Sequence, residues 1–157
     1  MMAETMAEKT SAVLLLLNPS GPLQSLSQEL ESQSVRTRQA TSCAEAARLL
    51  AAVNPPEVIF TETQLPDGNW ADVVRLAQKA SQPVNVIVVS RLVDIRLYVE
   101  TLQNGAFDFI APPFEPSELS HVLRCAVGNV TTRRNVLARA GGVRAPALKQ
   151  MALPGAC

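Results

Sequence analysis

The chain has 157 residues, about one domain's worth, and 47% of them are apolar, which is enough for a single core. Its formal net charge is zero, so composition gives no global reason to expect nucleic acid or an anionic membrane surface as a partner. The three cysteines have no close spacing and predict neither a disulfide framework nor a zinc site, and the longest apolar run near the N-terminus is too short to cross a bilayer.

The charge is nevertheless unevenly distributed along the chain. Residues 1–127 carry nine basic and fourteen acidic side chains, whereas residues 128–157 carry five basic side chains and no acid. Arg133, Arg134 and Arg139 fall on an expected extension of the last helix, and we expect them to be solvated cations near its C-terminus. Because no aromatic residues are interleaved with them, nucleic acid is not expected as a partner.

The first half of the chain alternates strand and helix patterns. A continuous apolar run over 12–17 is typical of a strand buried on both faces, and the Asn-Pro-Ser-Gly sequence that follows it stops the strand. The next elements are a helix over 22–32, a half-polar edge strand over 35–39, a helix capped by Thr41 or Ser42, and a strand over 57–61. We expect Ala44, Ala47, Leu50 and Ala51 to form the inner face of the second helix.

The second half continues the alternation. Residues 62–69 are expected to form a loop with a turn at Leu65-Pro66-Asp67-Gly68. After this loop we expect a helix over 70–80, a largely apolar strand over 84–89, a helix over 92–102, a strand over 107–110 and a long helix from 116 to about 137.

Five strand–helix units with short connections predict one α/β domain. The expected fold is the flavodoxin-like (βα)5 doubly wound parallel sheet with strand order 2-1-3-4-5. We expect a disordered N-terminus over 1–10, the domain over 11–127, and a basic helix extension with a flexible tail over 128–157. In such folds the site lies outside the carboxyl ends of the strands, which directs attention to the residues that follow each one.

Those strand ends offer few groups for phosphoryl transfer, which needs a nucleophilic carboxylate, a magnesium ion held by oxygen ligands, and a cation. The first strand ends in Asn18 and Pro19, the third in Glu62 and the fourth in Ser90. One acid and one hydroxyl do not make a tight magnesium site, so we expect no metal and no cofactor. The same loops lack the glycine and hydroxyl clusters that cradle the phosphates of a flavin or nucleotide.

The chain resembles the receiver domain of bacterial two-component response regulators over about residues 11–127. The resemblance rests on the following segments: Val13-Leu-Leu-Leu-Leu-Asn-Pro, Glu57-Val-Ile-Phe-Thr-Glu-Thr-Gln-Leu-Pro-Asp-Gly, Val86-Ile-Val-Val-Ser and Gly105-Ala-Phe-Asp-Phe-Ile-Ala-Pro-Pro-Phe. It implies that the metal-binding acidic pair falls on Asn18 and Pro19, and the phospho-accepting aspartate on Glu62.

The resemblance also implies roles for later positions. Ser90 retains the hydroxyl of the switch, and Phe109 retains the switch aromatic without its hydroxyl. The invariant lysine falls on Pro112, and the following proline, which is often joined by a cis peptide bond, falls on Pro113. Two carboxylates and one cation are therefore missing, which indicates a degenerate pseudo-receiver whose acceptor chemistry is lost.

Several interpretations of single residues stay open. Glu62 is either a mimic of a phosphorylated aspartate, with Arg91 reaching across to it, or a solvated acid at a strand end. Ser90 and Phe109 are either a frozen switch pair or an ordinary hydroxyl and aromatic. Asp67 is expected to be a turn residue, the alternative being a displaced phospho-acceptor.

The favoured function is a cytoplasmic, non-enzymatic signalling module of two-component type that acts by protein–protein contact. Its partner is a protein of a signalling pathway, or a second copy bound through the face formed by residues 92–102, 107–110 and the last helix; no membrane contact is expected. The alternative is an active phosphorelay regulator that accepts a phosphoryl group at Glu62 or Asp67.

Overall fold

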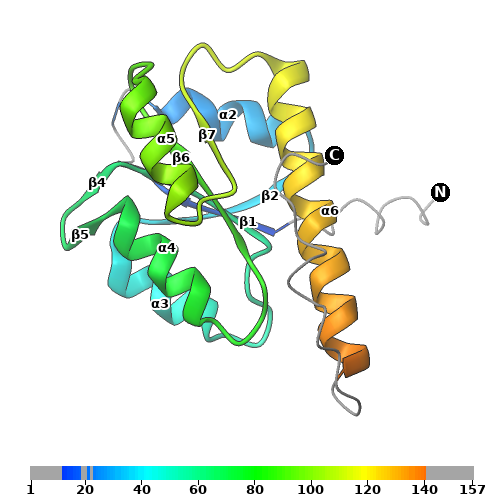
Figure 1. Ribbon diagram of the computed structural model, residues 1–157. Coiled ribbons are helices and arrows are strands. Elements are labelled where there is room, and N and C mark those ends of the chain that lie inside the picture. The colour runs from blue at the N-terminus through cyan, green and yellow to red at the C-terminus, as the bar shows by residue number, and fades with distance from the viewer. Residues whose placement is uncertain (1–11, 19–20, 22, 141–157) are drawn as a thin grey trace.

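The computed structural model describes residues 12–18, 21 and 23–140 (Figure 1). Its strands are β1 (Ala12–Leu16), β2 (Arg36–Ala40), β3 (Val58–Glu62), β4 (Gln64–Leu65), β5 (Gly68–Asn69), β6 (Asn85–Val89) and β7 (Asp108–Ile110). Its helices are α2 (Gln24–Ser32), α3 (Cys43–Leu50), α4 (Trp70–Lys79), α5 (Ile95–Gln103) and α6 (Pro116–Ala140). The predicted disorder over 1–10 and the flexible tail from 141 lie outside the described residues.

Five strands form one parallel sheet in the order β2-β1-β3-β6-β7. Since β4 and β5 pair only with each other, β6 and β7 are the fourth and fifth strands of this sheet along the chain. The order therefore confirms the predicted flavodoxin-like order 2-1-3-4-5. The central strands β3 and β6 are buried along their whole length, because helices cover both faces of a doubly wound parallel sheet. The edge strand β2 has mostly exposed or half-exposed side chains, as its half-polar sequence predicts.

Two apolar layers hold the helices against the sheet. On one face, α3 and α4 pack on the sheet through residues that include Leu50, Val73 and Val74. On the other face, α2 and α6 pack on it through residues that include Leu26, Leu30, Leu119 and Leu123. Because successive strand residues point to opposite faces, Ile59 joins the first layer and Phe60 the second.

Some predicted boundaries and faces were wrong. The helix expected over 92–102 begins at Ile95, because the side chain of Asp94 caps it by accepting a hydrogen bond from Leu97 N at 3.1 Å. Ser42 does cap α3, as predicted, through a 3.2 Å bond from Glu45 N. The inner face of α3, however, is formed by Ala46 and Leu50, while Ala44 and Ala51 are exposed.

The segment expected as a loop after β3 contains a small antiparallel hairpin. Glu62 is the last residue of β3, and β4 then pairs with β5 across the turn at Pro66-Asp67. Asn69 ends the hairpin and caps α4 in a reciprocal capping box with Asp72. The hairpin therefore connects the end of β3 directly to a well-anchored helix.

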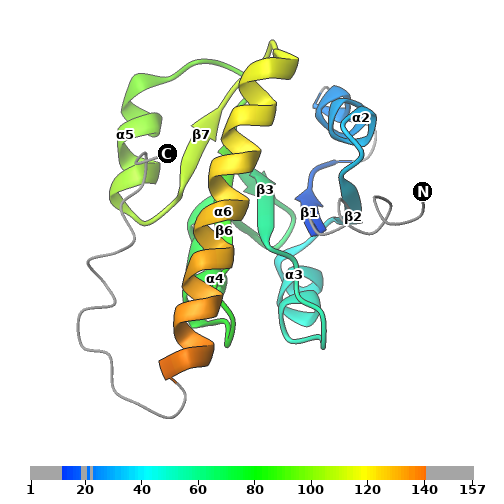
Figure 2. The same ribbon diagram turned by 90° about the vertical axis from the view of Figure 1, so that its right-hand side faces the viewer.

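Helix α6 continues without interruption past residue 127 and ends at Ala140 (Figures 1 and 2). Val130, in this extension, is fully buried. Arg134 Nε and Nη2 each donate a 2.9 Å hydrogen bond, to the carbonyl oxygens of Pro83 and Pro56 respectively. The prediction of solvated cations is therefore wrong for this arginine, which ties α6 to the segments that precede β3 and β6.

A second network anchors the same helix. Asn85, the first residue of β6, is buried, and its Nδ2 donates to Ala126 O and to Asn129 Oδ1, each at 3.0 Å. Arg133 Nη1 donates to Asn85 Oδ1 at 2.9 Å and to Asn129 Oδ1 at 3.1 Å, so this arginine is not simply solvated either.

No helix in the described part of the chain is long and apolar enough to cross a membrane.

Candidate functional site

A cleft of about 610 Å³ lies where the carboxyl ends of β1, β3 and β6 meet. We call it the Glu62 cleft. It is lined by Leu17, Asn18, Thr41, Glu62, Thr63, Gln64, Leu65, Pro66, Ser90, Arg91, Leu92 and Asp94. Parallel strands deliver their last residues to one edge of the sheet, so the topology brings together Asn18, Glu62 and Ser90 from distant parts of the sequence.

Glu62 is held from two sides at the centre of this cleft. Its side chain is only 9% exposed. Asn18 N donates a 3.0 Å hydrogen bond to Glu62 Oε2, and Arg91 Nη2 lies 3.5 Å from Glu62 Oε1 in an ion pair. Glu62 is therefore not a solvated acid at a strand end, and that interpretation was wrong.

Arg91 belongs to the turn after β6, the strand that pairs with β3 through Glu62 and Val89. This adjacency explains how its side chain reaches the carboxylate across the ends of two neighbouring strands. The guanidinium remains 57% exposed at the mouth of the cleft. The end of β6 thus places a cation beside the carboxylate of Glu62.

Ser90 is buried, but its hydroxyl is engaged with its own turn. Ser90 Oγ donates to Leu92 O at 2.7 Å and accepts from Leu92 N at 3.3 Å. Within the described residues, no hydrogen bond joins Ser90 Oγ to Glu62. The hydroxyl and the acid share the cleft without being coupled to each other.

Phe109 lies on β7, half-buried, and its ring packs edge-on against Tyr98 of α5 with centroids 5.7 Å apart. Edge-to-face contacts of this kind are the favoured geometry of aromatic pairs. Phe109 therefore links the edge strand to α5, and the structure places it against the first apolar layer of the core.

The other positions singled out from the sequence occupy the rim or lie outside the description. Asn18 is exposed and contributes its backbone N–H rather than a carboxylate. Pro19 lies outside the described residues. The peptide bond between Pro112 and Pro113 is cis, as the resemblance implied for Pro113. Proline at 112 provides no cation.

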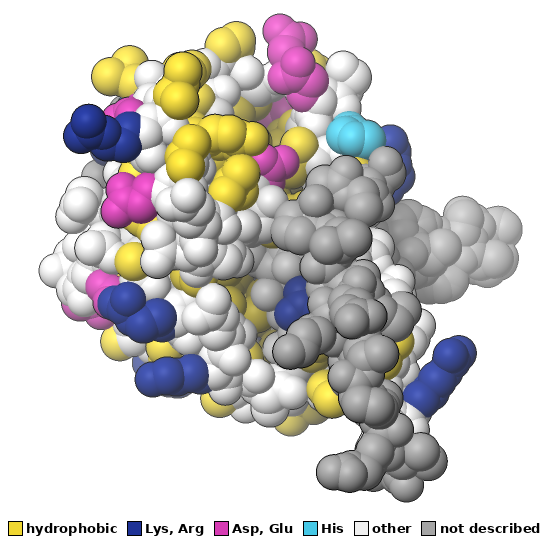
Figure 3. All heavy atoms as spheres, viewed as in Figure 1, with side chains coloured by type: hydrophobic (Ala, Val, Ile, Leu, Met, Phe, Trp, Pro, Cys, Tyr) yellow, Lys and Arg dark blue, Asp and Glu magenta, His cyan; other side chains and the backbone are white. Residues whose placement is uncertain are grey.

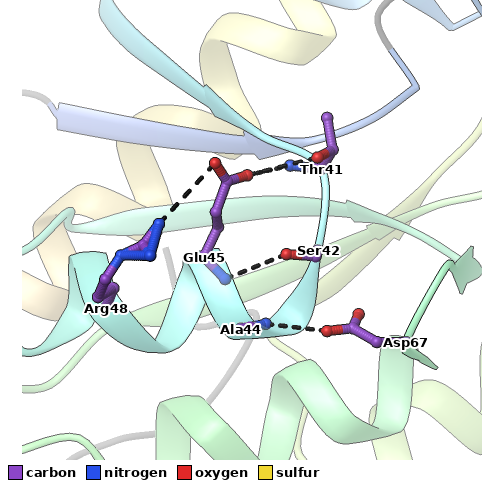
Figure 4. A network of polar contacts seen from close by, with 6 residues as sticks. All are labelled: Thr41, Ser42, Ala44, Glu45, Arg48 and Asp67. Atoms are coloured by element: carbon purple, nitrogen blue, oxygen red, sulfur yellow. Dashed lines mark hydrogen bonds and ion pairs between the residues drawn. The ribbon is translucent and has the colours of Figure 1, made fainter.

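Asp67 lies in the turn of the β4–β5 hairpin, and its side chain caps the N-terminus of α3 (Figure 4). Its Oδ1 accepts from Cys43 N at 2.8 Å and its Oδ2 accepts from Ala44 N at 3.1 Å. These backbone donors, that of Cys43 first, lower the pKa of Asp67 below its ordinary value. Both oxygens are thus used to hold the hairpin against the N-terminus of α3, a role that the turn pattern alone did not predict.

The residues of the Glu62 cleft do not fit a resident magnesium ion. Hard divalent cations need several oxygen ligands, usually including more than one carboxylate in an all-protein site. The described residues contain no group of three or more histidine, cysteine, aspartate or glutamate side chains arranged to hold a metal. Glu62 itself is already paired with a guanidinium, which competes with a cation for the same oxygens.

The sequence and the order of the strands have counterparts among known proteins. The sequence profile of the response regulator receiver domain matches residues 20–124, about two thirds of the chain. The chain belongs to the response regulator receiver domain family.

Two curated relatives illustrate this receiver's likeness to bacterial regulators. It is 28% identical over 111 residues to the photosynthetic apparatus regulatory protein RegA of Cereibacter sphaeroides, covering 70% of this chain and 60% of RegA. It is 28% identical over 68 residues to the chemotaxis protein CheY of Thermotoga maritima, covering 43% of this chain and 57% of CheY. The receiver thus spans less than two thirds of the length of these relatives.

Solved receiver structures share the fold at low identity. The receiver domain from Clostridium thermocellum superposes with a TM-score of 0.66 at 23% identity, covering 81% of this chain and 98% of that one. The receiver domain of the sensor histidine kinase PA1611 from Pseudomonas aeruginosa, whose structure has magnesium coordinated in its active-site cleft, gives 0.62 at 23% identity, covering 75% and 98%. These similarities show the fold alone.

Proposed function

We propose that this receiver signals by protein–protein contact without phosphorylation at its acceptor position. The observation that carries the proposal is the engagement of Glu62. Its two carboxylate oxygens are taken by Asn18 N and Arg91, so the acceptor position is charge-paired and mostly shielded from solvent. On this proposal the chain is not an enzyme, and Glu62 with Arg91 stands in permanently for a phosphorylated acid and its cation.

A glutamate is one methylene longer than an aspartate, so its charge projects further into the cleft. The pair Glu62–Arg91 then fixes the ends of β3 and β6 relative to each other. Since no phosphoryl group draws the Ser90 hydroxyl inward, it stays with Leu92. These contacts support a receiver held in one state, because on this proposal no phosphoryl group binds one state of the switch more tightly than the other.

Asp67 is the other acid that could act as an acceptor. Its two oxygens already cap α3, and attaching a phosphoryl group would remove at least one of those hydrogen bonds. This geometry disfavours the phosphorelay alternative at Asp67, and the ion pair disfavours it at Glu62.

Intact-protein mass spectrometry after incubation with acetyl phosphate and magnesium tests the proposal. We expect no mass increase for the native chain. The matched control is the variant Asn18→Asp, Pro19→Asp, Glu62→Asp, Pro112→Lys, which restores the missing groups, and we expect it to gain one phosphoryl group. A labile phosphate on the native chain, removed by Glu62→Gln or Asp67→Asn, would establish the phosphorelay alternative instead.

The surface of α5 supports a second component of the proposal, self-association. Large apolar side chains gather there and in the turn before it (Figure 3). Leu92, Val93 and Ile95 are 76%, 78% and 74% exposed, and Tyr98 and Val99 are 41% and 43% exposed. Contiguous apolar side chains on a surface mark a contact site more often than scattered ones do.

We propose that this α5 surface, with β7 and α6, binds a second copy of the chain. The receiver domain of NtrC4 is described as a dimer in its beryllofluoride-activated form, and it matches this fold with a TM-score of 0.64 at 23% identity, covering 76% of this chain and 98% of that one. Arg96 and Glu100 lie four residues apart on α5, so a second copy related by a two-fold axis can pair Arg96 of each copy with Glu100 of the other.

Analytical ultracentrifugation over a range of concentrations tests this component. We expect Ile95→Glu to shift the chain toward monomer by at least tenfold in dissociation constant. Val53→Glu is the matched control, because Val53 is 94% exposed on the loop before β3. A native chain that stays monomeric at high concentration, or an Ile95→Glu variant that associates as the native chain does, would contradict self-association through α5.

A further inference from the structure

A second cleft, of about 630 Å³, lies at the amino ends of the strands, at the opposite edge of the sheet from Glu62. We call it the arginine cleft. It is lined by Arg36, Thr37, Arg38, Val53, Asn54, Pro55, Glu57, Gln82 and Arg134. Since β3 has five residues, the two clefts are separated by roughly 16 Å of strand.

Three guanidinium groups from two elements line this cleft. Arg36 and Arg38 come from β2, and Arg134 comes from α6. Glu57, just before β3, is the one acid among the described lining residues. The cleft is therefore positively charged on a chain whose remaining body is acidic.

Two of these arginines are held in place by backbone carbonyls. Arg38 Nη2 donates to Asn54 O at 3.1 Å, and Arg134 donates to Pro56 O and Pro83 O. Each keeps further N–H donors that these bonds do not use, because a guanidinium has five. Arg36 is exposed and makes no hydrogen bond or ion pair to the described residues. Fixed guanidinium groups bind anions at a smaller cost in conformational entropy than free ones.

We propose that the arginine cleft binds carboxylate side chains on an acidic segment of a protein partner. Planar guanidinium groups match carboxylates with paired hydrogen bonds. Glu57 would repel a doubly charged phosphate ion more strongly than a singly charged carboxylate. Val53 and Pro55 add an apolar rim that a small inorganic ion would leave uncovered but that the side chains of a peptide would cover.

The test is an NMR titration of the ¹⁵N-labelled full chain with a synthetic peptide of alternating glutamate and leucine. We expect shifts of the amide signals of Arg36–Arg38 and Asn54, weakened as salt is raised because the interaction is between charges near the surface. Arg36→Glu should weaken binding at least tenfold. Because Arg36 is exposed and unpaired with described residues, this variant should keep the native spectrum elsewhere.

Lys79→Glu is the control, since Lys79 is exposed at the end of α4, outside the arginine cleft and outside the α5 surface. It should bind the peptide as the native chain does. Equal binding by Arg36→Glu and Lys79→Glu, or an absence of amide shifts in the cleft, would overturn the proposal. Inorganic phosphate that produced the same shifts while the peptide produced none would also overturn it, in favour of a phosphate site.

Discussion

Replacing Arg134 with alanine removes two hydrogen bonds that tie α6 to the segments before β3 and β6. A hydrogen bond from a charged donor contributes about 1.5–3 kcal/mol when buried. Arg134 is only half-buried, and water can reach part of both carbonyl groups once the side chain is gone. We therefore expect Arg134→Ala to lower the free energy of unfolding by about 2 kcal/mol in total.

For a domain of this size the loss corresponds to a fall in Tm of roughly 6–10 °C. Urea unfolding followed by circular dichroism gives the free energy, and calorimetry gives Tm. The matched control is Arg139→Ala, which removes an exposed arginine from the last turn of the same helix. It should change the free energy of unfolding by less than about 0.5 kcal/mol. If the two variants lost the same stability, the carbonyl contacts would not be what holds α6 in place.

The same reasoning applies to truncation. A chain ending at 127 loses the buried Val130 and leaves the amide of Asn85 without Asn129 and Arg133, whereas a chain ending at 140 keeps all of them. The shorter chain should be less stable by several kcal/mol, about 2 from Val130 alone. Binding experiments that remove the basic tail should therefore cut after Ala140.

Three further predictions follow from local geometry. Asp67→Asn should lower the free energy of unfolding at neutral pH, as measured by urea titration. The pKa of Asp67 is lower in the folded chain than its unfolded value of 3.8, so its stabilisation is present above pH 3.8 and is lost as the pH falls through the folded pKa. The difference between the variant and the native chain should therefore shrink as the pH falls below 3.8. Burial first, and Asp67 next, raise the pKa of Cys43 from 9.0 to about 11, so site-resolved iodoacetamide alkylation at pH 8 should be about 100-fold slower than for a free cysteine, and faster in Asp67→Asn. Gly105→Ala should cost about 1–2 kcal/mol in thermal unfolding, because φ is +108° and the added Cβ would lie 2.5 Å from Gln78 Nε2; Gly128→Ala, in open space on a helix, should not destabilise.

The fold was predictable because it depends on local sequence patterns, namely the spacing of apolar residues and of capping residues. The run of apolar residues over 86–89 and the spacing of Leu119, Leu123 and Ala126 follow directly from burial on a sheet and on one helix face. Ser42 was predictable as a cap for the same reason, since capping depends on residues three apart. Helix starts were harder, because Leu92 and Val93 fit a helical pattern although they lie exposed before the cap at Asp94.

The polar contacts between distant segments were not predictable in the same way. Asn85 is a polar residue at the start of an otherwise apolar, buried strand. Because buried polar groups are hydrogen-bonded, its presence there indicates a polar partner from another segment of the chain. Nothing in the spacing identified Asn129 and Arg133 as those partners. The cap of α3 by Asp67 was missed for the same reason, because it joins residues 24 apart through a hairpin that the sequence indicated only as a turn.

On the function proposed above, the Glu62 cleft explains how the receiver fold can persist without phosphorylation at its acceptor position. The groups that hold the fold together, such as Phe60 and Val88 inside the sheet, are separate from those at the strand ends. Several carboxylates gathered at one strand edge repel one another unless a divalent ion neutralises them. With an amide at 18 and an ion pair between Glu62 and Arg91, the edge is neutralised by the protein's own groups. On the proposed function, the cleft therefore needs no metal ion for its charge balance, and the outer surfaces of the molecule make the signalling contacts.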